Sequence, residues 1–197
     1  MRITGGTFRS RLLSAPTGRA TRPTSDRTRE GLFGILSAAG DVEGARVLDL
    51  YAGTGALGLE ALSRGAAHVV FVESAREAVR VLRQNVGSLG VEDRTTVIAG
   101  EVGASRTSAA VRAVSPFDLV LVDPPWSLVD DGDAPEKLRS LIAGGVLREG
   151  GTLVLERSSR GTSPAIEGTF HAEDRRYGDA TLAFYKTAIL GRPRGDS

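Results

Sequence analysis

The sequence has no cysteine, which excludes disulfide bonds, thiolate metal sites and every mechanism that depends on a cysteine nucleophile. It has only two histidines, His68 and His171, too few for a dedicated histidine metal cluster. No run reaches the roughly 18 uninterrupted apolar residues that span a membrane, and the first residues lack the apolar core of a secretion signal. We therefore expect a cytoplasmic globular protein with no metal and no membrane partner.

The sequence also has no large excess of charge of one sign. It contains 25 Lys and Arg residues and 24 Asp and Glu residues, which gives a net charge of +1. This balance argues against a protein that coats nucleic acid along its whole surface. It conceals an uneven distribution, because residues 1–29 contain seven arginines and a single acid, Asp26. By formal charge this segment carries about +6 and the rest of the chain about −5. The N-terminal segment is therefore the expected place of contact with phosphate groups.

Short apolar segments alternate with helical segments along most of the 197 residues, a length typical of one domain. Apolar runs predict strands at 46–51, 68–72, 95–99, 117–122 and 152–156. Helices are expected over 26–39 with Asp26 as the N-cap, after the glycines as far as 64, and over 75–89, 104–114 and 135–143. This alternation indicates a parallel sheet covered by helices on both faces.

Two hairpins are predicted at the ends of the chain. Gly5-Gly6 indicates a turn near the N-terminus, and Tyr177-Gly178-Asp179 separates the last two strand-like segments, 169–175 and 181–186. The expected fold is thus α/β, with a doubly wound, Rossmann-like sheet that is mostly parallel and ends in an antiparallel hairpin. We expect a basic β-hairpin arm over 1–25, a catalytic domain over 26–190 and a flexible tail over 191–197.

A glycine-rich turn follows the first predicted strand, in the sequence Asp49-Leu-Tyr-Ala-Gly53-Thr-Gly55-Ala-Leu-Gly58. Glycines permit a tight turn and a close approach of the backbone to a ligand, and the helix N-terminus beyond offers unpaired N–H groups. Glu73 ends the next predicted strand, where a carboxylate can accept hydrogen bonds from both hydroxyls of a ribose. The spacing fits either a dinucleotide or an adenosyl ligand.

Asp49 distinguishes between a dinucleotide and an adenosyl ligand, because a carboxylate within an apolar strand requires a polar partner. The ammonium group of S-adenosylmethionine would be such a partner, whereas a nicotinamide dinucleotide has no comparable cation at this loop. Two alternatives stay open on the glycine pattern alone. One is an NAD-dependent oxidoreductase, and the other is a simple turn in which Glu73 caps the following helix.

The fourth predicted strand runs directly into Asp123-Pro124-Pro125-Trp126. It ends at the same edge of the sheet as the glycine loop, where doubly wound folds bind ligands. The two prolines make a rigid corner that is rich in acceptors, and Trp126 adds a flat stacking surface. A planar base with an exocyclic amine fits this corner, since Asp123 and the Pro124 carbonyl can hold its two N–H bonds. The alternative is a proline-stiffened loop with a core tryptophan.

Several segments together resemble the RsmD family, Rossmann-type S-adenosylmethionine-dependent methyltransferases that act on N2 of a guanine in small-subunit (16S) rRNA. They are Arg22-Pro-Thr-Ser-Asp-Arg-Thr-Arg-Glu30-Gly-Leu-Phe33, Ala52-Gly-Thr-Gly-Ala-Leu-Gly-Leu-Glu-Ala-Leu-Ser-Arg-Gly65, Asp123-Pro-Pro-Trp126 and the leading Gly5-Gly6-Thr-Phe-Arg-Ser-Arg-Leu. The resemblance extends over most of the chain. Trp126 stands where Phe or Tyr is more usual, and Glu101-Val102 where Asn-Ala or Asp-Ala is common near the adenine.

The resemblance implies S-adenosylmethionine as methyl donor, S-adenosylhomocysteine as product and 16S rRNA as substrate, within a small-subunit particle or assembly intermediate. The catalytic residues that it implies are Asp123, Pro124, Pro125 and Trp126, and we expect the enzyme to be a monomer. The implied cofactor residues are Thr24, Asp49, Ala52, Gly53, Gly55, Glu73, Ser74, Glu101 and Asp123. Contacts with RNA are expected from Arg9, Arg11, Arg22 and Arg27. Methylation of DNA at adenine N6 or cytosine N4 stays open, as does a non-catalytic RNA-binding module.

Overall fold

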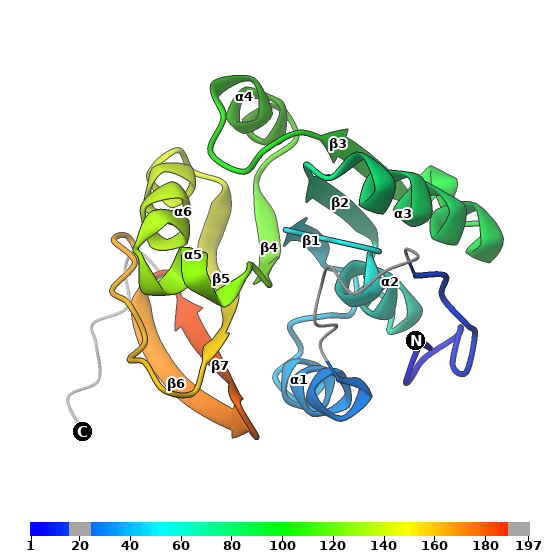
Figure 1. Ribbon diagram of the computed structural model, residues 1–197, viewed down its shortest axis with the longest axis horizontal. Helices are drawn as coiled ribbons and strands as arrows, with labels where there is room; N and C mark the ends of the chain where they lie inside the picture. Colours follow the sequence, from blue (N-terminus) through cyan, green and yellow to red (C-terminus); the bar gives the residue numbers. More distant parts are fainter. Residues whose placement is uncertain (16–24, 189–197) are drawn as a thin grey trace.

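Seven strands form one sheet in the order β3-β2-β1-β4-β5-β7-β6 in the computed structural model, which describes residues 1–15 and 25–188 (Figure 1). They are β1 (Arg46–Leu50), β2 (His68–Glu73), β3 (Thr95–Ala99), β4 (Phe117–Val122), β5 (Leu147–Ser158), β6 (Phe170–Tyr177) and β7 (Ala180–Lys186). Strands β1 to β5 pair in parallel, whereas β7 is antiparallel to both β5 and β6. The predicted α/β sheet with its C-terminal antiparallel hairpin is confirmed.

Helices cover both faces of this sheet (Figure 1). Apolar side chains of α1 (Asp26–Ala38), α2 (Ala56–Ser63) and α3 (Arg76–Leu89) belong to the core on one face. Those of α4 (Ser105–Ala113), α5 (Trp126–Asp130) and α6 (Asp133–Ala143) belong to the core on the other, and a short 3-10 helix, Glu92–Arg94, precedes β3. In β1, Val47 joins the first core and Leu48 the second, because successive side chains of a strand point to opposite faces.

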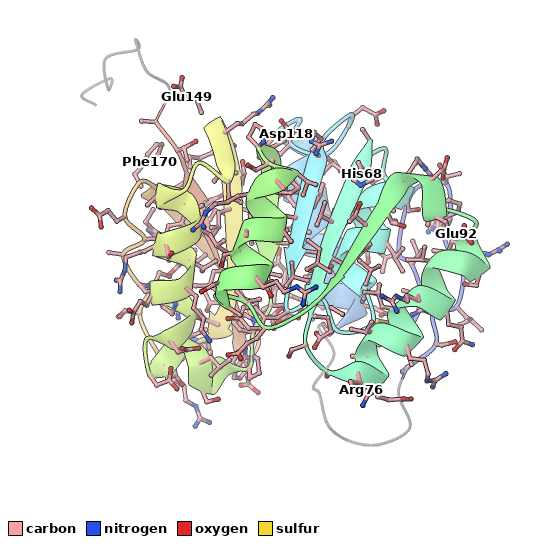
Figure 2. The ribbon with its side chains drawn as sticks, turned by 90° about the horizontal axis from the view of Figure 1, so that it is seen from above. His68, Arg76, Glu92, Asp118, Glu149 and Phe170 are labelled. Carbon is pink, nitrogen blue, oxygen red and sulfur yellow. The ribbon has the colours of Figure 1, made fainter. Side chains whose placement is uncertain are left out.

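Figure 2 shows the two edges of the parallel sheet at which its strands begin and end. His68, at the start of β2, and Asp118, near the start of β4, lie at one edge, whereas Arg76, which begins α3 just after β2, lies at the opposite edge. That opposite edge holds the carboxyl ends of the parallel strands. The strand order reverses between β1 and β4, and doubly wound sheets bind ligands at the carboxyl edge beside such a reversal.

The structure differs from the helix predictions in two places. Asp26 is not the N-cap of α1 but its first residue, because the Oγ of Ser25 accepts the N–H of Thr28 at 3.0 Å and caps the helix. Helix α5 was not predicted at all, since two prolines precede it. Proline is compatible with a position just before a helix, and the carbonyl of Pro125 accepts the N–H of Leu128 at 2.9 Å.

Strand β5 is also longer than the predicted 152–156. It begins at Leu147 and includes Gly150-Gly151, which read locally as a turn. The pairing with β4 shifts between the Phe117–Leu147 pair and the Leu119–Thr152 pair, so β5 contains extra residues at this irregularity. Gly150 has a φ of 70° and lies in this irregularity with Gly151, so β5 pairs with β4 on both sides of the two glycines and bulges at them.

The predicted N-terminal hairpin is present and packs against the body of the protein. Arg2 and Leu12 form its β-bridge, and Ile3 is fully buried in the core of α1–α3. The buried carboxylate of Glu60, on α2, accepts the N–H groups of Thr4 at 2.8 Å and Gly5 at 2.9 Å. The hairpin is therefore anchored by a buried acid, while the division into arm and catalytic domain stays a prediction and the predicted tail, 191–197, lies outside the described residues.

Candidate active site

Asp49 lies in β1 with its carboxylate buried under the first turn of α2. Its Oδ2 accepts the N–H of Gly58 at 2.9 Å, whereas Oδ1 is buried and has no hydrogen-bond partner among the described residues. Burial raises the pKa of Asp49 to about 8, although the Gly58 hydrogen bond lowers it, and the charges of Asp123 and Glu73 raise it further. An ammonium group bound here would pair with the orphaned oxygen and favour the ionised carboxylate.

Glu73, the last residue of β2, holds the glycine loop between β1 and α2. Its Oε2 accepts the N–H of Gly53 at 2.8 Å, and its Oε1 accepts those of Ser74 and Ala75, both at 2.8 Å. Gly53 has a φ of 54°, and the space that a Cβ would occupy there is open. Glu73 therefore joins the glycine loop to the turn between β2 and α3, and the loop leaves room for a ligand beside its backbone.

Gly58 has a different role from Gly53, because it packs α2 tightly on β2. A Cβ at Gly58 would lie 2.3 Å from Cε1 of Phe71 and 2.7 Å from Cγ1 of Val69. This close packing places the N-terminus of α2 at the carboxyl edge of the sheet, where its N–H groups can meet a ligand.

The Asp-Pro-Pro-Trp corner continues β4, the strand beside β1. The backbone N–H of Asp123 donates to the carbonyl of Leu50 at 3.4 Å, which joins the ends of the two strands. Pro124 is buried, Pro125 is exposed, and the side chains of Asp123 and Trp126 are half-buried. Trp126 is fixed as the first residue of α5, so the corner presents a carboxylate and an indole at the ligand-binding edge.

A hollow of about 530 Å³ opens beside Trp126. Its lining comes from α5, the end of β5, the β5–β6 connection and the β6–β7 turn, with the residues Trp126, Asp130, Ser158, Arg160, Gly161 and Asp179. This volume falls within the range of about 300–1,000 Å³ that is usual for ligand pockets. The hollow therefore offers room for a planar ring beside Trp126.

Arg157 supports the wall of this hollow that the β5–β6 connection forms. It is buried, and its guanidinium donates to the carbonyls of Ser158 at 2.7 Å and Gly161 at 2.8 Å. It also donates to Ser163 Oγ at 2.8 Å and forms an ion pair with Asp174 at 2.8 Å. Sequence reasoning missed this support, because Arg157 carries no signal that separates it from the other arginines.

Glu101 follows β3, the strand that pairs with β2. Its side chain is 69% exposed, and Lys137 of α6 donates to it at 3.1 Å while also pairing with Asp133 at 2.8 Å. Nearby, Tyr51 has a φ of 60°, and its Oη is buried without a partner among the residues described. Burial raises the pKa of Tyr51 to about 12. Sequence reasoning named neither Lys137 nor Tyr51, and a positive φ outside glycine has no sequence signal.

The chain matches a family model described as "Conserved hypothetical protein 95" over residues 1–186. The chain belongs to this family. It is 31% identical over 191 residues to the "Putative rRNA methyltransferase YlbH" of Bacillus subtilis, a match that covers 94% of this chain and 98% of that relative. It is 39% identical over 126 residues to the ribosomal RNA small subunit methyltransferase D of Escherichia coli, covering 64% of this chain and 60% of that relative.

A solved structure gives the same assignment. The structure named "Putative methyltransferase yhhF from Escherichia coli" has a TM-score of 0.77 and 29% identity, and the match covers 95% of this chain and 98% of that one. The resemblance seen in the motifs is confirmed, and the chain is an S-adenosylmethionine-dependent methyltransferase of the RsmD type. Over 1–15 and 25–188, no group of three or more His, Asp or Glu residues could hold a metal ion, and no helix has the length and apolarity to cross a bilayer.

The predicted RNA-contacting arginines differ in their surroundings. Arg9 and Arg27 are exposed, and Arg11 is exposed with one Nη2 contact to the carbonyl of Ser88 at 3.2 Å. Arg22 and the predicted cofactor residue Thr24 lie outside the described residues. The individual roles of these residues, and of the predicted cofactor and catalytic residues, stay predictions.

Arg29 shows that not every arginine of the basic segment faces solvent. It is fully buried and pairs with Asp26 at 2.8 Å and with Glu60 at 3.4 Å. Its charge is therefore neutralised inside the protein, which leaves the exposed arginines as the phosphate contacts to test.

Proposed function

We propose that this protein transfers a methyl group from S-adenosylmethionine to the exocyclic N2 amine of a guanine in small-subunit (16S) rRNA. The observation that carries the proposal is the placement of Asp49 and Asp123 at the ends of neighbouring strands, where the strand order reverses. One carboxylate is buried with an oxygen suited to a cation, and the other stands beside an indole and a hollow. The rRNA substrate is supported by the names of the relatives.

The residues at the carboxyl ends of β1 and β2 fit the cofactor. Oδ1 of Asp49 would accept the ammonium group, and Glu73 would accept the ribose hydroxyls beside the Gly53 backbone. When bound, S-adenosylmethionine supplies a methyl group on a sulfonium sulfur, which becomes a neutral thioether after transfer. Thr24, Ala52, Gly55, Ser74 and Glu101 are the further cofactor contacts that the family resemblance implies.

The corner after β4 holds the amine that receives the methyl group. Asp123 and the carbonyl of Pro124 accept its two N–H bonds, which directs the nitrogen lone pair at the methyl carbon. The new N–C bond forms as the S–C bond breaks, and alignment can supply much of the roughly 7–11 kcal/mol available from proximity. The nitrogen is cationic after transfer, so its proton then leaves to Asp123 or to solvent. No harder nucleophile is required.

RNA would reach this site across the basic N-terminal hairpin. Exposed Arg9 and Arg11 of the hairpin and Arg27 of α1 are suited to phosphate, while the acidic remainder of the chain limits binding elsewhere. The protein would act in the cytoplasm as a monomer on a small-subunit particle or an assembly intermediate. A comparison of the initial methylation rate on naked 16S rRNA with that on small subunits tests which form of the RNA is the substrate. Gel filtration with light scattering tests whether the protein is a monomer.

Three alternatives have less support than methylation of rRNA. An amine of DNA, at adenine N6 or cytosine N4, would fit the Asp123 corner equally well, but the relatives are named for rRNA. An NAD-dependent oxidoreductase leaves the unpartnered oxygen of Asp49 and the Asp-Pro-Pro-Trp corner without a role. An RNA-binding module without catalysis leaves the cofactor loop without a role.

The decisive experiment combines labelled S-adenosylmethionine with small subunits from cells that lack the enzyme. Nuclease digestion and nucleoside mass spectrometry should identify N2-methylguanosine in the small-subunit rRNA. Asp123→Ala should lose turnover while it still binds RNA. Unlabelled rRNA would overturn the proposal, and N6-methyladenine or N4-methylcytosine in a DNA substrate would support the alternative.

A further inference from the structure

The strand register places side chains of four neighbouring strands in one row on the α1–α3 face of the sheet. Asp49 of β1 pairs with Phe71 of β2 and with Leu121 of β4. Leu121 in turn pairs with Val154 of β5. Phe71, Leu121 and Val154 all belong to the core under α1, α2 and α3, which fixes the face on which this row lies.

Carboxylates continue this row at the carboxyl edge. The residues two positions beyond Phe71, Leu121 and Val154 are Glu73, Asp123 and Glu156, and they face the same side because side chains alternate along a strand. With Asp49, the order across the sheet is therefore Glu73 on β2, Asp49 on β1, Asp123 after β4 and Glu156 on β5. The first three have proposed roles with the ribose, the ammonium group and the target amine, whereas the proposed function gives Glu156 no role.

Glu156 lies on the base side of Asp123, away from the cofactor loop. The pairing of Val122 with Leu155 makes Asp123 and Glu156 the next neighbours across β4 and β5. Glu156 is only 8% exposed and lies with Leu32, Leu57 and Leu182 around a small cavity. Ser158, two residues further along β5, lines the hollow beside Trp126. Along β5, Glu156 therefore lies next to the corner that would hold the amine and two residues before a residue that lines the hollow.

The chemistry of guanine matches a second carboxylate at this position. In guanine the N1–H group is next to the N2 amine, so a base that places its amine at Asp123 presents another donor close by. A carboxylate can only accept, and a weakly solvated one distinguishes strongly between a donor and a ring nitrogen with a lone pair. Adenine and cytosine carry such an unprotonated ring nitrogen next to their amines.

We propose that Glu156 selects guanine by accepting the N1–H of the target base while Asp123 and the Pro124 carbonyl hold its N2 amine. This inference rests on the proposed function, because it assumes that guanine N2 is the methylated atom. It assigns Glu156 to specificity, and the methyl transfer itself stays with the corner after β4.

The test uses RNA that carries either guanine or 2-aminopurine at the methylated position, located first by mass spectrometry. 2-Aminopurine keeps the amine at C2 but has no hydrogen on N1. The variants are Glu156→Gln, which preserves size, and Glu156→Ala. The control is Glu149→Gln, which makes the same charge change on the same strand at the opposite edge (Figure 2). Each protein is also measured for melting temperature and for S-adenosylhomocysteine affinity.

We expect wild-type protein to prefer guanine over 2-aminopurine by about a hundredfold or more in kcat/KM, because a site built to bind a donor rejects an analogue without it. Glu156→Gln should reduce this preference by at least about tenfold, while Glu149→Gln should retain it. Failure of wild-type protein to methylate guanine would remove the proposed function itself. Equal use of both bases by wild-type protein overturns the role of Glu156 even if no variant folds. A folded Glu156 variant that keeps the wild-type preference for guanine over 2-aminopurine also overturns the role of Glu156. This holds even if the variant is less stable or binds the cofactor more weakly.

Discussion

Asp49 accepts the backbone N–H of Gly58 at 2.9 Å through Oδ2, while Oδ1 has no partner in the described part of the chain. The hydrogen bond fixes the carboxyl group under the start of α2, and burial raises its pKa to about 8. The cofactor-free site therefore carries a proton near neutral pH. A ligand with an ammonium group has to displace that proton.

Binding of S-adenosylhomocysteine should strengthen as pH rises towards 8, because its ammonium group pairs with ionised Asp49. Below the pKa of about 8 the affinity should rise about tenfold per pH unit, and above it the dependence should level off. Calorimetry at pH 7 in two buffers of different ionisation enthalpy should detect the release of nearly one proton. A flat affinity between pH 6 and 8 with no proton release would contradict this.

Asp49→Asn should stabilise the cofactor-free protein while weakening cofactor binding. The folded pKa of about 8 exceeds the ordinary value of 3.8, so the folded wild-type state binds more protons between these limits. Wild-type stability should therefore fall relative to Asp49→Asn as pH rises from 4 to 8, in urea unfolding at both ends of this range. At pH 8.5 the variant should bind S-adenosylhomocysteine about 10- to 100-fold more weakly. Equal affinities would exclude the proposed ammonium contact.

Glu60→Ala should destabilise the protein without changing its chemistry. Glu60 is fully buried, accepts the N–H of Thr4 at 2.8 Å and pairs with Arg29 at 3.4 Å. Removing it leaves a buried charge and unpaired hairpin donors, which typically costs about 3–5 kcal/mol of unfolding free energy. Glu77→Ala, at an exposed pair with Arg80, is the control and should change the unfolding curve little. A similar loss in both variants would argue against the anchoring role.

Trp126 should contribute to substrate binding through its ring. Trp126→Ala should lower kcat/KM for the RNA substrate by about tenfold to a hundredfold, since stacking on a base is worth about 1–3 kcal/mol. Trp126→Phe should retain most of the activity, because a smaller aromatic ring can still stack. S-adenosylhomocysteine affinity, measured by calorimetry, should be the same in all three proteins. Loss of cofactor affinity in Trp126→Ala would show that the side chain supports the cofactor loop instead.

Neutralising Arg9 and Arg11 together should weaken RNA binding and flatten its dependence on salt. Both side chains are exposed on the anchored hairpin, and the slope of log affinity against log salt should fall by about one for each arginine–phosphate pair that the substitutions remove. The matched control is Arg106→Gln with Arg139→Gln, at exposed positions of α4 and α6. Filter binding across a salt series measures both slopes. An identical weakening in the control would mean that overall charge, and not the hairpin, attracts the RNA.

Local patterns predicted most of the elements because the signals for these elements are themselves local. The apolar runs at 95–99 and 117–122 became β3 and β4 with the same limits. The start of β5 was not predicted, because Gly150-Gly151 forms a bulge and only the pairing of Leu147 with Phe117 extends the strand before it. Helix α5 was not predicted, because two prolines interrupt the helical pattern that would indicate it.

The sequence by itself determined the fold class, the glycine-rich loop and the corner with its carboxylate and indole, because each depends on residues close together in the chain. Only the tertiary structure decided which of these groups meet. The hydrogen bond from Gly53 to Glu73 joins residues 20 positions apart, and that from Thr4 to Glu60 joins residues 56 apart. The placement of Glu156 beside Asp123 depends on the register of two strands that a helical crossover separates. Packing and strand register determine these contacts, and they cannot be predicted from the periodicity of the sequence.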